Sequence, residues 1–272
     1  MTLLNLLGKS IDYYFSFLPR KKPLPSLVAQ ANLIAHRGAH DKNRIIIENT
    51  HAAFNHALNL GCWGIEFDLQ ETADEVLVVN HDPTLRRLWQ KDVAIKELTF
   101  QTLRKLVPQV PSLAEVIENY GKRMHLFIEL KAPLTSEMLL IDALRHLTPC
   151  EDYHLLSLDE TIFASLQYFP KKALLLVAGH NNVKKFCQLS LEKHYGGVLG
   201  HYLLLNKNLI KRLEEREDQI VGVGMIASKF GLYRELNRDI QWLFSDNVAL
   251  MSAYLRALKE EARLNAPPTI SE

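Results

Sequence analysis

The 272-residue sequence has few of the features that mark secreted, nucleic-acid-binding or multidomain proteins. It contains only three cysteines, Cys62, Cys150 and Cys187, which are widely spaced and match no metal-site pattern, so we expect reduced thiols and a cytoplasmic location. The formal net charge of +1 at pH 7 gives no basic footprint for a nucleic acid. No internal repeat, low-complexity run or long linker divides the sequence. These absences favour one main domain, for which 47% hydrophobic residues supply an ample core.

Residues 1–22 combine an apolar helical stripe with a basic end. The stripe consists of Leu3, Leu4, Leu7, Ile11, Tyr14, Phe15 and Leu18. Arg20, Lys21 and Lys22 follow it, and Pro23 and Pro25 are expected to stop the helix. The segment is too short and polar for a membrane span and lacks the cleavage site of a signal peptide. Two interpretations stay open: a helix packed on the domain, or an interfacial helix that gives peripheral membrane contact through residues 1–22.

Apolar strand-like runs alternate with helical segments along the rest of the chain. Strands are expected at Leu33–His36, Trp63–Leu69, Val76–His81, Met124–Leu130, Tyr153–Leu158, Ala173–Ala178, Gly197–Gly200, Ile220–Ile226 and Trp242–Ser245. Helices are expected at Thr50–Leu60, Ser112–Tyr120, Ser136–Leu147, Glu160–Tyr168, Val183–His194, Lys207–Glu217, Lys229–Asn237 and Val248–Leu264. This alternation predicts an α/β fold.

The second and third strands are separated only by the region of Ala73 and Asp74, too short for the crossover that parallel strands need. We therefore expect a short antiparallel hairpin after strand two. Eight parallel strands remain, the number that closes a (β/α)8 TIM barrel. The expected organisation is an N-terminal amphipathic helix and basic linker at 1–25, the barrel at 26–264 and a polar tail at 265–272.

Two carboxylates alternate with apolar residues in the second strand. The period of two places Glu66 and Asp68 on one face of that strand, about 6–7 Å apart. Taken alone, this pattern is typical of a solvated strand face. If both side chains are buried, a hard divalent cation such as Mg²⁺ or Ca²⁺ would relieve their repulsion.

Further polar residues stand where other strands end, which is where function sits in barrels of this kind. They are His36 and Arg37 after the first strand, His81 after the hairpin, and Glu129 and Lys131 on the fourth strand. So many polar side chains at successive strand ends are not expected by chance. The pattern therefore favours a functional site over a solvated face.

The residue types at these strand ends indicate the chemistry. The three carboxylates, Glu66, Asp68 and Glu129, form an oxygen-rich set that suits Mg²⁺ or Ca²⁺ rather than zinc. The two basic side chains, Arg37 and Lys131, suit a phosphoryl group. The two histidines titrate near neutrality and can divide general acid and general base duties. Together these groups predict metal-assisted cleavage of a phosphate ester.

Five ordered motifs carry a resemblance to a known family. They are Ala35-His-Arg-Gly38, Glu48-Asn-Thr50, Ile65-Glu-Phe-Asp68, Asn80-His-Asp-Pro-Thr-Leu85 and Ile128-Glu-Leu-Lys131. In order and spacing they resemble the glycerophosphodiester phosphodiesterases, which are metal-dependent TIM-barrel enzymes. Pro111-Ser-Leu-Ala-Glu-Val116 also resembles a helix start of that family. The resemblance is strong over residues 32–132.

The resemblance implies a role for each of these polar residues. Glu66, Asp68 and Glu129 would be the metal ligands, His36 and His81 the acid–base pair, Arg37 and Lys131 the phosphate-binding residues, and Glu48 the support of Arg37. The implied reaction is hydrolysis of a glycerophosphodiester to sn-glycerol 3-phosphate and an alcohol. Two alternatives stay open: a lysophospholipase D that cleaves lysophospholipids, and a catalytically inactive binding barrel.

Three segments depart from the pattern that is usual in this family. They are Ser157-Leu-Asp159, Gly222-Val-Gly-Met225 and Ser245-Asp-Asn247, and we expect them to shape the alcohol pocket more than the phosphate site. The span between His81 and Pro111 is compact and leaves little room for a substrate-capping insertion. The remaining histidines are expected to be surface or packing residues. Among them, His180 and His201 follow strand ends and lie nearest the expected pocket.

Overall fold

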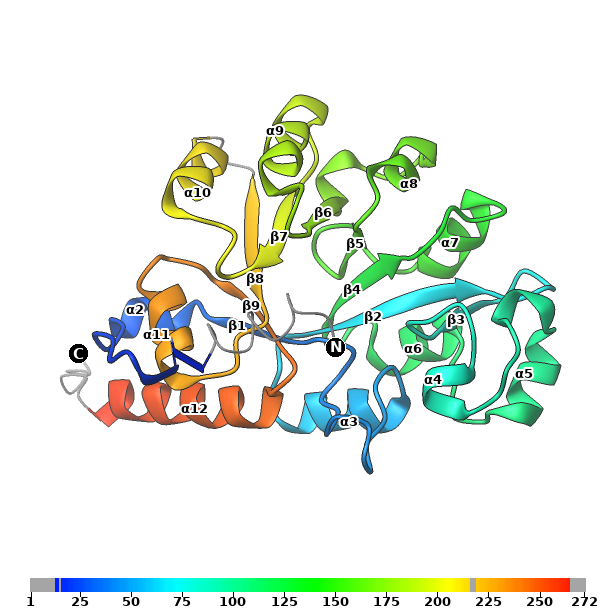
Figure 1. The fold of residues 1–272 in the computed structure, drawn as a ribbon, viewed down its shortest axis with the longest axis horizontal. Helices are drawn as coiled ribbons and strands as arrows, with labels where there is room; N and C mark the ends of the chain where they lie inside the picture. Colours follow the sequence, from blue (N-terminus) through cyan, green and yellow to red (C-terminus); the bar gives the residue numbers. More distant parts are fainter. Residues whose placement is uncertain (1–12, 15, 216–218, 265–272) are drawn as a thin grey trace, which may run out of the picture.

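The computed structural model describes residues 13, 14, 16–215 and 219–264. Within them, parallel strands follow one another around a barrel (Figure 1). These strands are β1 (Asn32–Ala35), β2 (Gly64–Glu71), β4 (His125–Leu130), β5 (Tyr153–Ser157), β6 (Leu174–Ala178), β7 (Gly197–His201), β8 (Ile220–Gly224) and β9 (Trp242–Ser245). The ring closes because β1 pairs in parallel with both β2 and β9. The predicted α/β barrel is confirmed.

Helices between the strands cover the outside of the barrel (Figure 1). They are α3 (His51–Asn59), α6 (Leu113–Tyr120), α7 (Glu137–Leu144), α8 (Glu160–Ser165), α9 (Val183–Lys193), α10 (Lys207–Glu214), α11 (Lys229–Leu236) and α12 (Val248–Leu264), with the 3-10 turn η2 (Lys171–Ala173) before β6. Polar residues start several of these helices. Ser112 and Glu115 form the expected capping box at α6, in which each side chain bonds the other residue's backbone N–H.

The strand β3 (Leu77–Val79) runs antiparallel to β2, with Val79 opposite Leu69. After it come α4 (Arg86–Trp89), the 3-10 turn η1 (Ile95–Glu97) and α5 (Phe100–Leu106), which the sequence pattern did not predict. These elements are too short to show the periodic pattern of apolar residues from which a helix is predicted. Their stability comes from a small separate core, made of Val78, Leu85, Ile95, Leu103, Val107 and Val110.

The N-terminal segment is described only in part. Residues 1–12 and 15 of the expected amphipathic helix, and the expected tail at 265–272, lie outside the described residues. Pro25, expected only to stop a preceding helix, begins the short helix α2 (Pro25–Ala29). Proline suits this first position because its missing N–H would have no intrahelical partner there. No helix in the described part of the chain is long and apolar enough to cross a membrane.

The strands bury both of their faces, as a parallel sheet requires. Residues such as Ile65, Phe67 and Leu69 point outward and pack in the large core beneath the helices. The inward residues of six strands form a second, smaller core inside the barrel, made of Ile34, Phe127, Leu156, Leu175, Leu199 and Phe244. Glu66 alternates with Ile65 and Phe67, so the strand period directs this carboxylate inward.

A pair of buried histidines lies near the N-terminal ends of the strands. His125 Nε2 and His154 Nδ1 are 2.8 Å apart, and the other ring nitrogen of His125 lies 3.0 Å from the carbonyl oxygen of Glu151. The ring of His125 stacks on Trp63 with centroids 4.5 Å apart. Burial lowers the pKa of His125 to about 4 and that of His154 to about 3. Both rings are therefore neutral at pH 7, and the expectation of packing residues holds for them.

Candidate active site

Three buried carboxylates meet where β2 and β4 run side by side. Asp68 stands opposite Glu129 in the strand pairing, and Glu66 lies two residues earlier on the same face. One oxygen from each of the three side chains lies within 4.8 Å of the others. Their residues are only 2%, 1% and 7% exposed in the order Glu66, Asp68, Glu129, which rules out a solvated strand face.

The electrostatics of this cluster call for a positive charge. Burial, with the charge of Asp68, raises the pKa of Glu66 to about 8. Burial and Asp68 also raise the pKa of Glu129. Glu66 Oε1 is buried and has no hydrogen-bond partner among the described residues. Three close oxygen ligands, one of them unsatisfied, fit a hard divalent cation.

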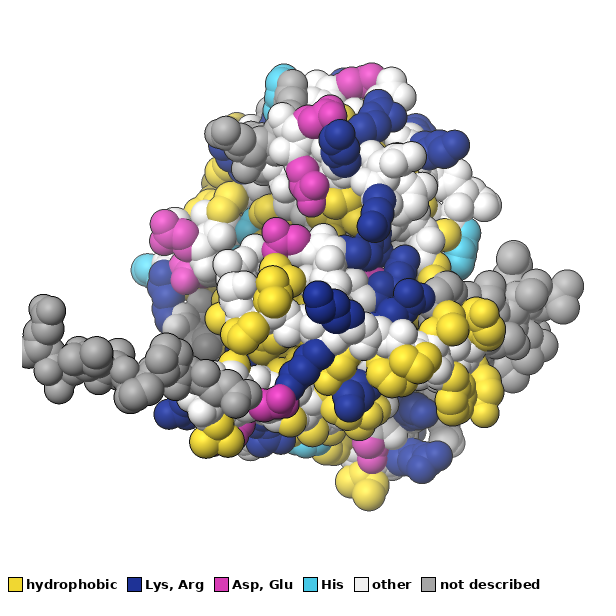
Figure 2. Space-filling view, turned by 90° about the vertical axis from the view of Figure 1, so that its left-hand side faces the viewer, with side chains coloured by type: hydrophobic (Ala, Val, Ile, Leu, Met, Phe, Trp, Pro, Cys, Tyr) yellow, Lys and Arg dark blue, Asp and Glu magenta, His cyan; other side chains and the backbone are white. Residues whose placement is uncertain are grey.

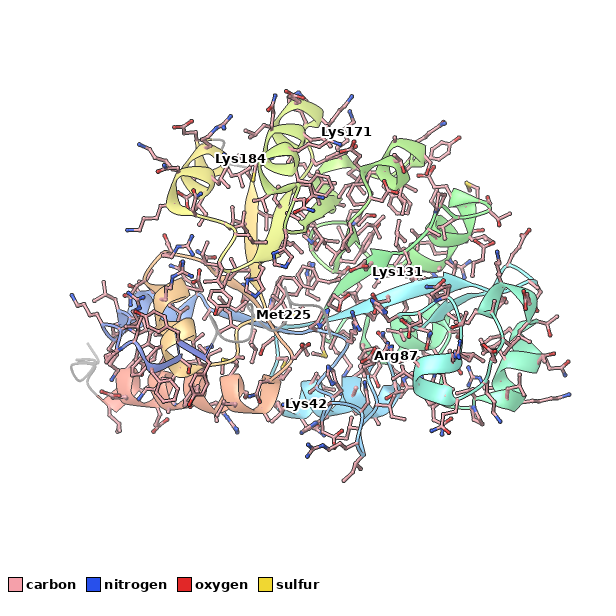
Figure 3. All side chains as sticks on the ribbon, in the orientation of Figure 1. Lys42, Arg87, Lys131, Lys171, Lys184 and Met225 are labelled. Carbon is pink, nitrogen blue, oxygen red and sulfur yellow. The ribbon has the colours of Figure 1, made fainter. Side chains whose placement is uncertain are left out.

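Lys131 compensates part of this negative charge. It follows the last residue of β4, and its Nζ lies 2.5 Å from Glu129 Oε1 and 3.3 Å from Asp68 Oδ1 (Figure 3). Burial on its own would lower the pKa of Lys131, but the charges of Glu129 and Asp68 outweigh it and raise the pKa. Lys131 is therefore cationic at neutral pH, at the edge of the carboxylate cluster.

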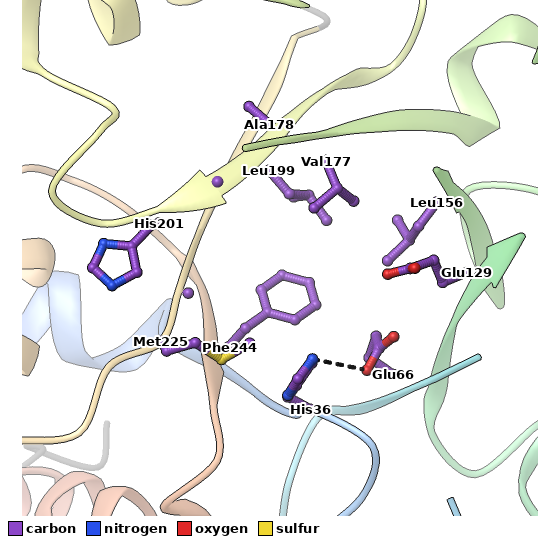
Figure 4. A pocket seen from close by; sticks show the side chains of 12 residues that line it. His36, Glu66, Glu129, Leu156, Val177, Ala178, Leu199, His201, Met225 and Phe244 are labelled. Carbon is purple, nitrogen blue, oxygen red and sulfur yellow. Dashed lines mark ion pairs between the residues drawn. The ribbon is translucent and has the colours of Figure 1, made fainter. Parts of the chain in front are cut away.

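His36 directly follows β1 and faces the cluster. Its Nε2 lies 3.8 Å from Glu66 Oε2 (Figure 4). Its Nδ1 lies 2.6 Å from Asp246 Oδ1. Burial would lower the pKa of His36, but the charge of Glu66 and the contact with Asp246 outweigh it, so the pKa is raised. In turn, the bonds to His36 and His40 overcome burial and hold the pKa of Asp246 far below its usual range. The contact with Asp246 fixes which ring nitrogen points into the site.

The turn after His36 brings Arg37 to the same place. Arg37 has a φ of +54° and Gly38 a φ of +78°. A Cβ on Gly38 would lie 2.7 Å from Cβ of Ala53, so only glycine fits this tight turn. The turn aims the backbone N–H of Arg37 at Glu66 Oε2, to which it donates at 2.9 Å.

Glu48 holds the guanidinium of Arg37, as the resemblance implied. Arg37 donates to Glu48 Oε1 at 3.0 Å, and Asn43 Nδ2 donates to Glu48 Oε2 at 2.7 Å. Arg87 donates to Glu48 Oε1 at 2.6 Å. Burial would raise the pKa of Glu48, but hydrogen bonds from Arg87 and Asn43 and the two arginine charges lower it to about 2. Glu48 is therefore an anion that orients two arginines.

His81 stands in the loop after β3, and it is not among the residues that line the cavity described below. Its Nδ1 lies 2.7 Å from Asp82 Oδ1, the same kind of contact that His36 makes with Asp246. Arg87 of α4 donates to Asp82 Oδ2 at 2.5 Å while it holds Glu48 (Figure 3). Arg87 thus links the support of His81 to the support of Arg37.

A cavity of about 210 Å³ opens beside these groups (Figure 4). One side carries His36, Glu66 and Glu129. The other side is mainly apolar and includes Leu156, Val177, Leu199, Met225 and Phe244. His201 also lines the cavity, and the ring of His180 lies 6.3 Å from that of His201 by centroids.

Three residues beside the site were not predicted as part of it. Asn49 donates to Asp68 Oδ2 at 2.8 Å, although Glu48-Asn-Thr50 had been recognised as a motif. Arg87 lies on a helix that the pattern did not predict. Asp246 was expected to shape the alcohol pocket, whereas in the structure it contacts His36. Gly224 and Met225, from another departing segment, line the cavity.

Part of the sequence is similar to known phosphodiesterases. Residues 36–147 match the model of the "Glycerophosphoryl diester phosphodiesterase family". A glycerophosphodiester phosphodiesterase of Caldanaerobacter subterraneus subsp. tengcongensis is 39% identical over 112 residues, which are 37% of this chain and 45% of that protein. A human lysophospholipase D is 42% identical over 67 residues, 25% of this chain and 20% of that protein. The chain thus spans less than half the length of these curated relatives.

Solved structures extend the likeness to the whole barrel. A phosphodiesterase of Oleispira antarctica, solved in complex with the product sn-glycerol-3-phosphate, superposes with a TM-score of 0.66. The superposition covers 83% of this chain and 96% of that one, at 20% sequence identity. At such low identity the likeness supports the fold alone.

Proposed function

Because the chain belongs to the glycerophosphodiester phosphodiesterase family, we propose that it hydrolyses glycerophosphodiesters to sn-glycerol 3-phosphate and an alcohol. One observation carries the proposal: a buried triad of carboxylates lies beside a histidine that is itself held by an aspartate. An inactive binding barrel is disfavoured, because burying such a set costs free energy that a scaffold has no reason to retain.

The carboxylates Glu66, Asp68 and Glu129 would hold one divalent cation, Mg²⁺ or Ca²⁺, as the cofactor. When bound, the cation would supply charge stabilisation at the phosphoryl oxygens. The set has three oxygen donors and neither a thiolate nor an imidazole, which favours these hard cations over zinc. The choice between Mg²⁺ and Ca²⁺ depends on how many ligands and waters complete the shell.

The basic residues Arg37 and Lys131 would bind the phosphoryl group of the substrate. Arg37 offers a planar fork of donors, and Glu48 fixes its orientation. Lys131 adds a point charge at the edge of the cluster. Both would counter the negative charge that grows on phosphorus oxygens in the transition state.

His36 and His81 would move the protons. Each has Nδ1 against an aspartate, Asp246 for His36 and Asp82 for His81, so Nε2 is the atom free to exchange a proton with substrate. One histidine would activate the nucleophile, either water or the neighbouring glycerol hydroxyl. The other would protonate the leaving alkoxide.

In this proposal the substrate is a small molecule and the protein acts in the cytoplasm. Residues 1–22 would give it peripheral contact with a membrane. A lysophospholipid is the second candidate substrate, since it carries the same diester together with one acyl chain. The apolar side of the cavity favours this candidate, because burying an alkyl group there removes apolar surface from water.

The test is a product analysis with purified protein. Glycerophosphocholine and lysophosphatidylcholine are offered in parallel with Mg²⁺ or Ca²⁺, and glycerol 3-phosphate and lysophosphatidic acid are quantified. We expect glycerol 3-phosphate and choline from the first substrate. Release of neither phosphate product under any metal condition would refute the proposal.

A further inference from the structure

Arg87 bonds two carboxylates that serve different parts of the site. Its Nε donates to Asp82 Oδ2 at 2.5 Å, and its Nη2 donates to Glu48 Oε1 at 2.6 Å. Asp82 also contacts the ring of His81, and Glu48 also accepts from Arg37. A chain of polar contacts thus runs from a proposed proton-transfer group to a proposed phosphate-binding group, with Arg87 at its centre.

The two contacts of Arg87 supply geometry more than stability. Figure 2 shows Lys and Arg side chains spread over one face of the molecule, and exposed ion pairs of such residues are worth little. The side chain of Arg87 is 44% exposed, so its two ion pairs also add little to the free energy of unfolding. Its guanidinium is planar and rigid, however, so two carboxylates bonded to Nε and Nη2 have a fixed relative position.

The backbone around His81 is held by other residues. Gln70 of β2 donates to the carbonyl oxygen of His81 at 3.1 Å. Trp89 Nε1 donates to Asn80 Oδ1 at 3.1 Å, and Asn80 Nδ2 donates to the carbonyl oxygen of Asp82 at 2.7 Å. Removing the guanidinium should therefore leave this loop in place and release only the carboxylate of Asp82.

The two carboxylates depend on Arg87 to different degrees. Glu48 keeps its bonds from Arg37 and Asn43 when Arg87 is removed. Within the described part of the chain, the side chain of Asp82 bonds only the ring of His81 and Arg87. Burial would raise the pKa of Asp82, but the hydrogen bonds of these two residues outweigh it and lower the pKa. Asp82 is therefore an anion whose orientation is set largely by Arg87.

We propose that Arg87 is a positioning residue for the proposed reaction, which fixes Asp82 and through it the imidazole of His81. Its second bond, to Glu48, ties this arrangement to the guanidinium of Arg37. The histidine that exchanges a proton and the arginine that binds the phosphoryl group are thereby held as one unit. The inference rests on the proposed function for its turnover readout, whereas phosphate binding is measured without turnover.

The experiment compares Arg87→Ala and Arg87→Lys with Arg86→Ala in the full-length protein. Arg86 is the exposed neighbour on α4, so Arg86→Ala is the matched control and should behave like the wild type. A misplaced catalytic group costs about 10²-fold in rate, so Arg87→Ala should lower kcat for glycerophosphocholine by about that factor and change KM much less. Arg87→Lys keeps the charge, but one ammonium does not bridge both carboxylates, so it should recover only part of kcat.

Two further readouts separate positioning from a general loss of structure. If Arg87 acts through His81, Arg87→Ala should cost almost nothing more in a His81→Ala background. Added guanidinium ion, at a concentration that does not unfold the protein, should restore part of the kcat of Arg87→Ala and leave Arg86→Ala unchanged. A kcat like that of Arg86→Ala, or a loss that multiplies fully with that of His81→Ala, overturns the inference.

Phosphate binding tests the second contact and separates the two proposals. Binding of inorganic phosphate with Mg²⁺, measured by calorimetry, should weaken in Arg87→Ala by up to about fivefold, the value of one partly exposed ion pair. The weakening should vanish in an Arg37→Ala background, and equal affinity in Arg87→Ala and Arg86→Ala would overturn the link to Arg37. This pattern without hydrolysis of any diester retains the link and refutes the proposed function. If the wild type neither binds phosphate nor hydrolyses a diester, both proposals are refuted.

Discussion

Replacing Glu66 with glutamine should stabilise the metal-free protein at neutral pH and remove its metal-dependent activity. Burial and the neighbouring Asp68 raise the pKa of Glu66 from 4.5 to about 8. A group whose folded pKa is raised contributes stability that is complete below its unfolded pKa and is lost as the pH rises toward the folded value. The metal-free wild type should therefore lose stability between pH 4.5 and pH 8.

The magnitude follows from the same values. A pH of 7 lies about 2.5 pH units above the unfolded pKa of Glu66, and one unit is worth 1.36 kcal/mol. The free energy of unfolding of the metal-free wild type should therefore be about 3 kcal/mol lower at pH 7 than at acidic pH. Glutamine keeps an oxygen that can accept from the backbone N–H of Arg37 but carries no charge. We expect Glu66→Gln to recover about 2–3 kcal/mol in EDTA.

The assay is urea unfolding in EDTA at pH 5 and pH 7, repeated with saturating Mg²⁺ or Ca²⁺. Glu118→Gln, an exposed carboxylate of α6, is the control and should match the wild type. A ligand at 100 times its Kd stabilises by about 2.7 kcal/mol, and this gain should appear in the wild type but not in Glu66→Gln. If Glu66→Gln is less stable than the wild type in EDTA at pH 7, the reasoning about the buried charge is refuted.

Three further predictions concern the histidines. His36→Ala and His81→Ala should each lower kcat by ~10²–10⁴-fold, and their combination should cost less than the product of the two; a single variant with wild-type kcat would exclude that residue from proton transfer. Asp246→Asn should move the limb of the pH–rate profile that reports His36 to lower pH, because the substitution removes the charge of Asp246, which helps to raise the pKa of His36. An unshifted profile would contradict the role of Asp246 as the support of His36. His125 and His154, whose pKa values fall from 6.5 to about 4 and about 3 on folding, together contribute stability that is present above pH 6.5 and is lost toward pH 4. The free energy of unfolding of Glu66→Gln should therefore fall as the pH is lowered across this range, and a flat curve would contradict the neutral state of the two rings.

The barrel could be predicted because its periodic patterns are long and its hairpin connection is short. The alternation around Glu66 and Asp68 correctly placed two carboxylates on one face, and the rule that parallel strands end at one rim brought them to Glu129. That the cluster is buried could not be read from the strand alone. It follows from closure of the ring, which pairs residues far apart in the chain.

The parts that escaped prediction depend on contacts distant in sequence. Asp246 reaches His36 only because β9 pairs with β1, and the segment Ser245-Asp-Asn247 departs from the family pattern. Arg87 acts from α4, a helix of four residues whose local sequence has no stripe to mark it. Its contacts to Glu48 and Asp82 are set by the small core under α4 and α5.

The central claim is that one divalent cation, held by Glu66, Asp68 and Glu129, supports diester hydrolysis by this chain. The most direct test adds Mg²⁺ or Ca²⁺ to chelator-stripped protein and measures ion binding by calorimetry and glycerophosphocholine hydrolysis on the same samples. We predict one tightly bound ion per chain, activity that rises in proportion to occupancy, and loss of both in Glu129→Gln. Full activity in excess chelator, or activity unrelated to occupancy, would contradict the claim.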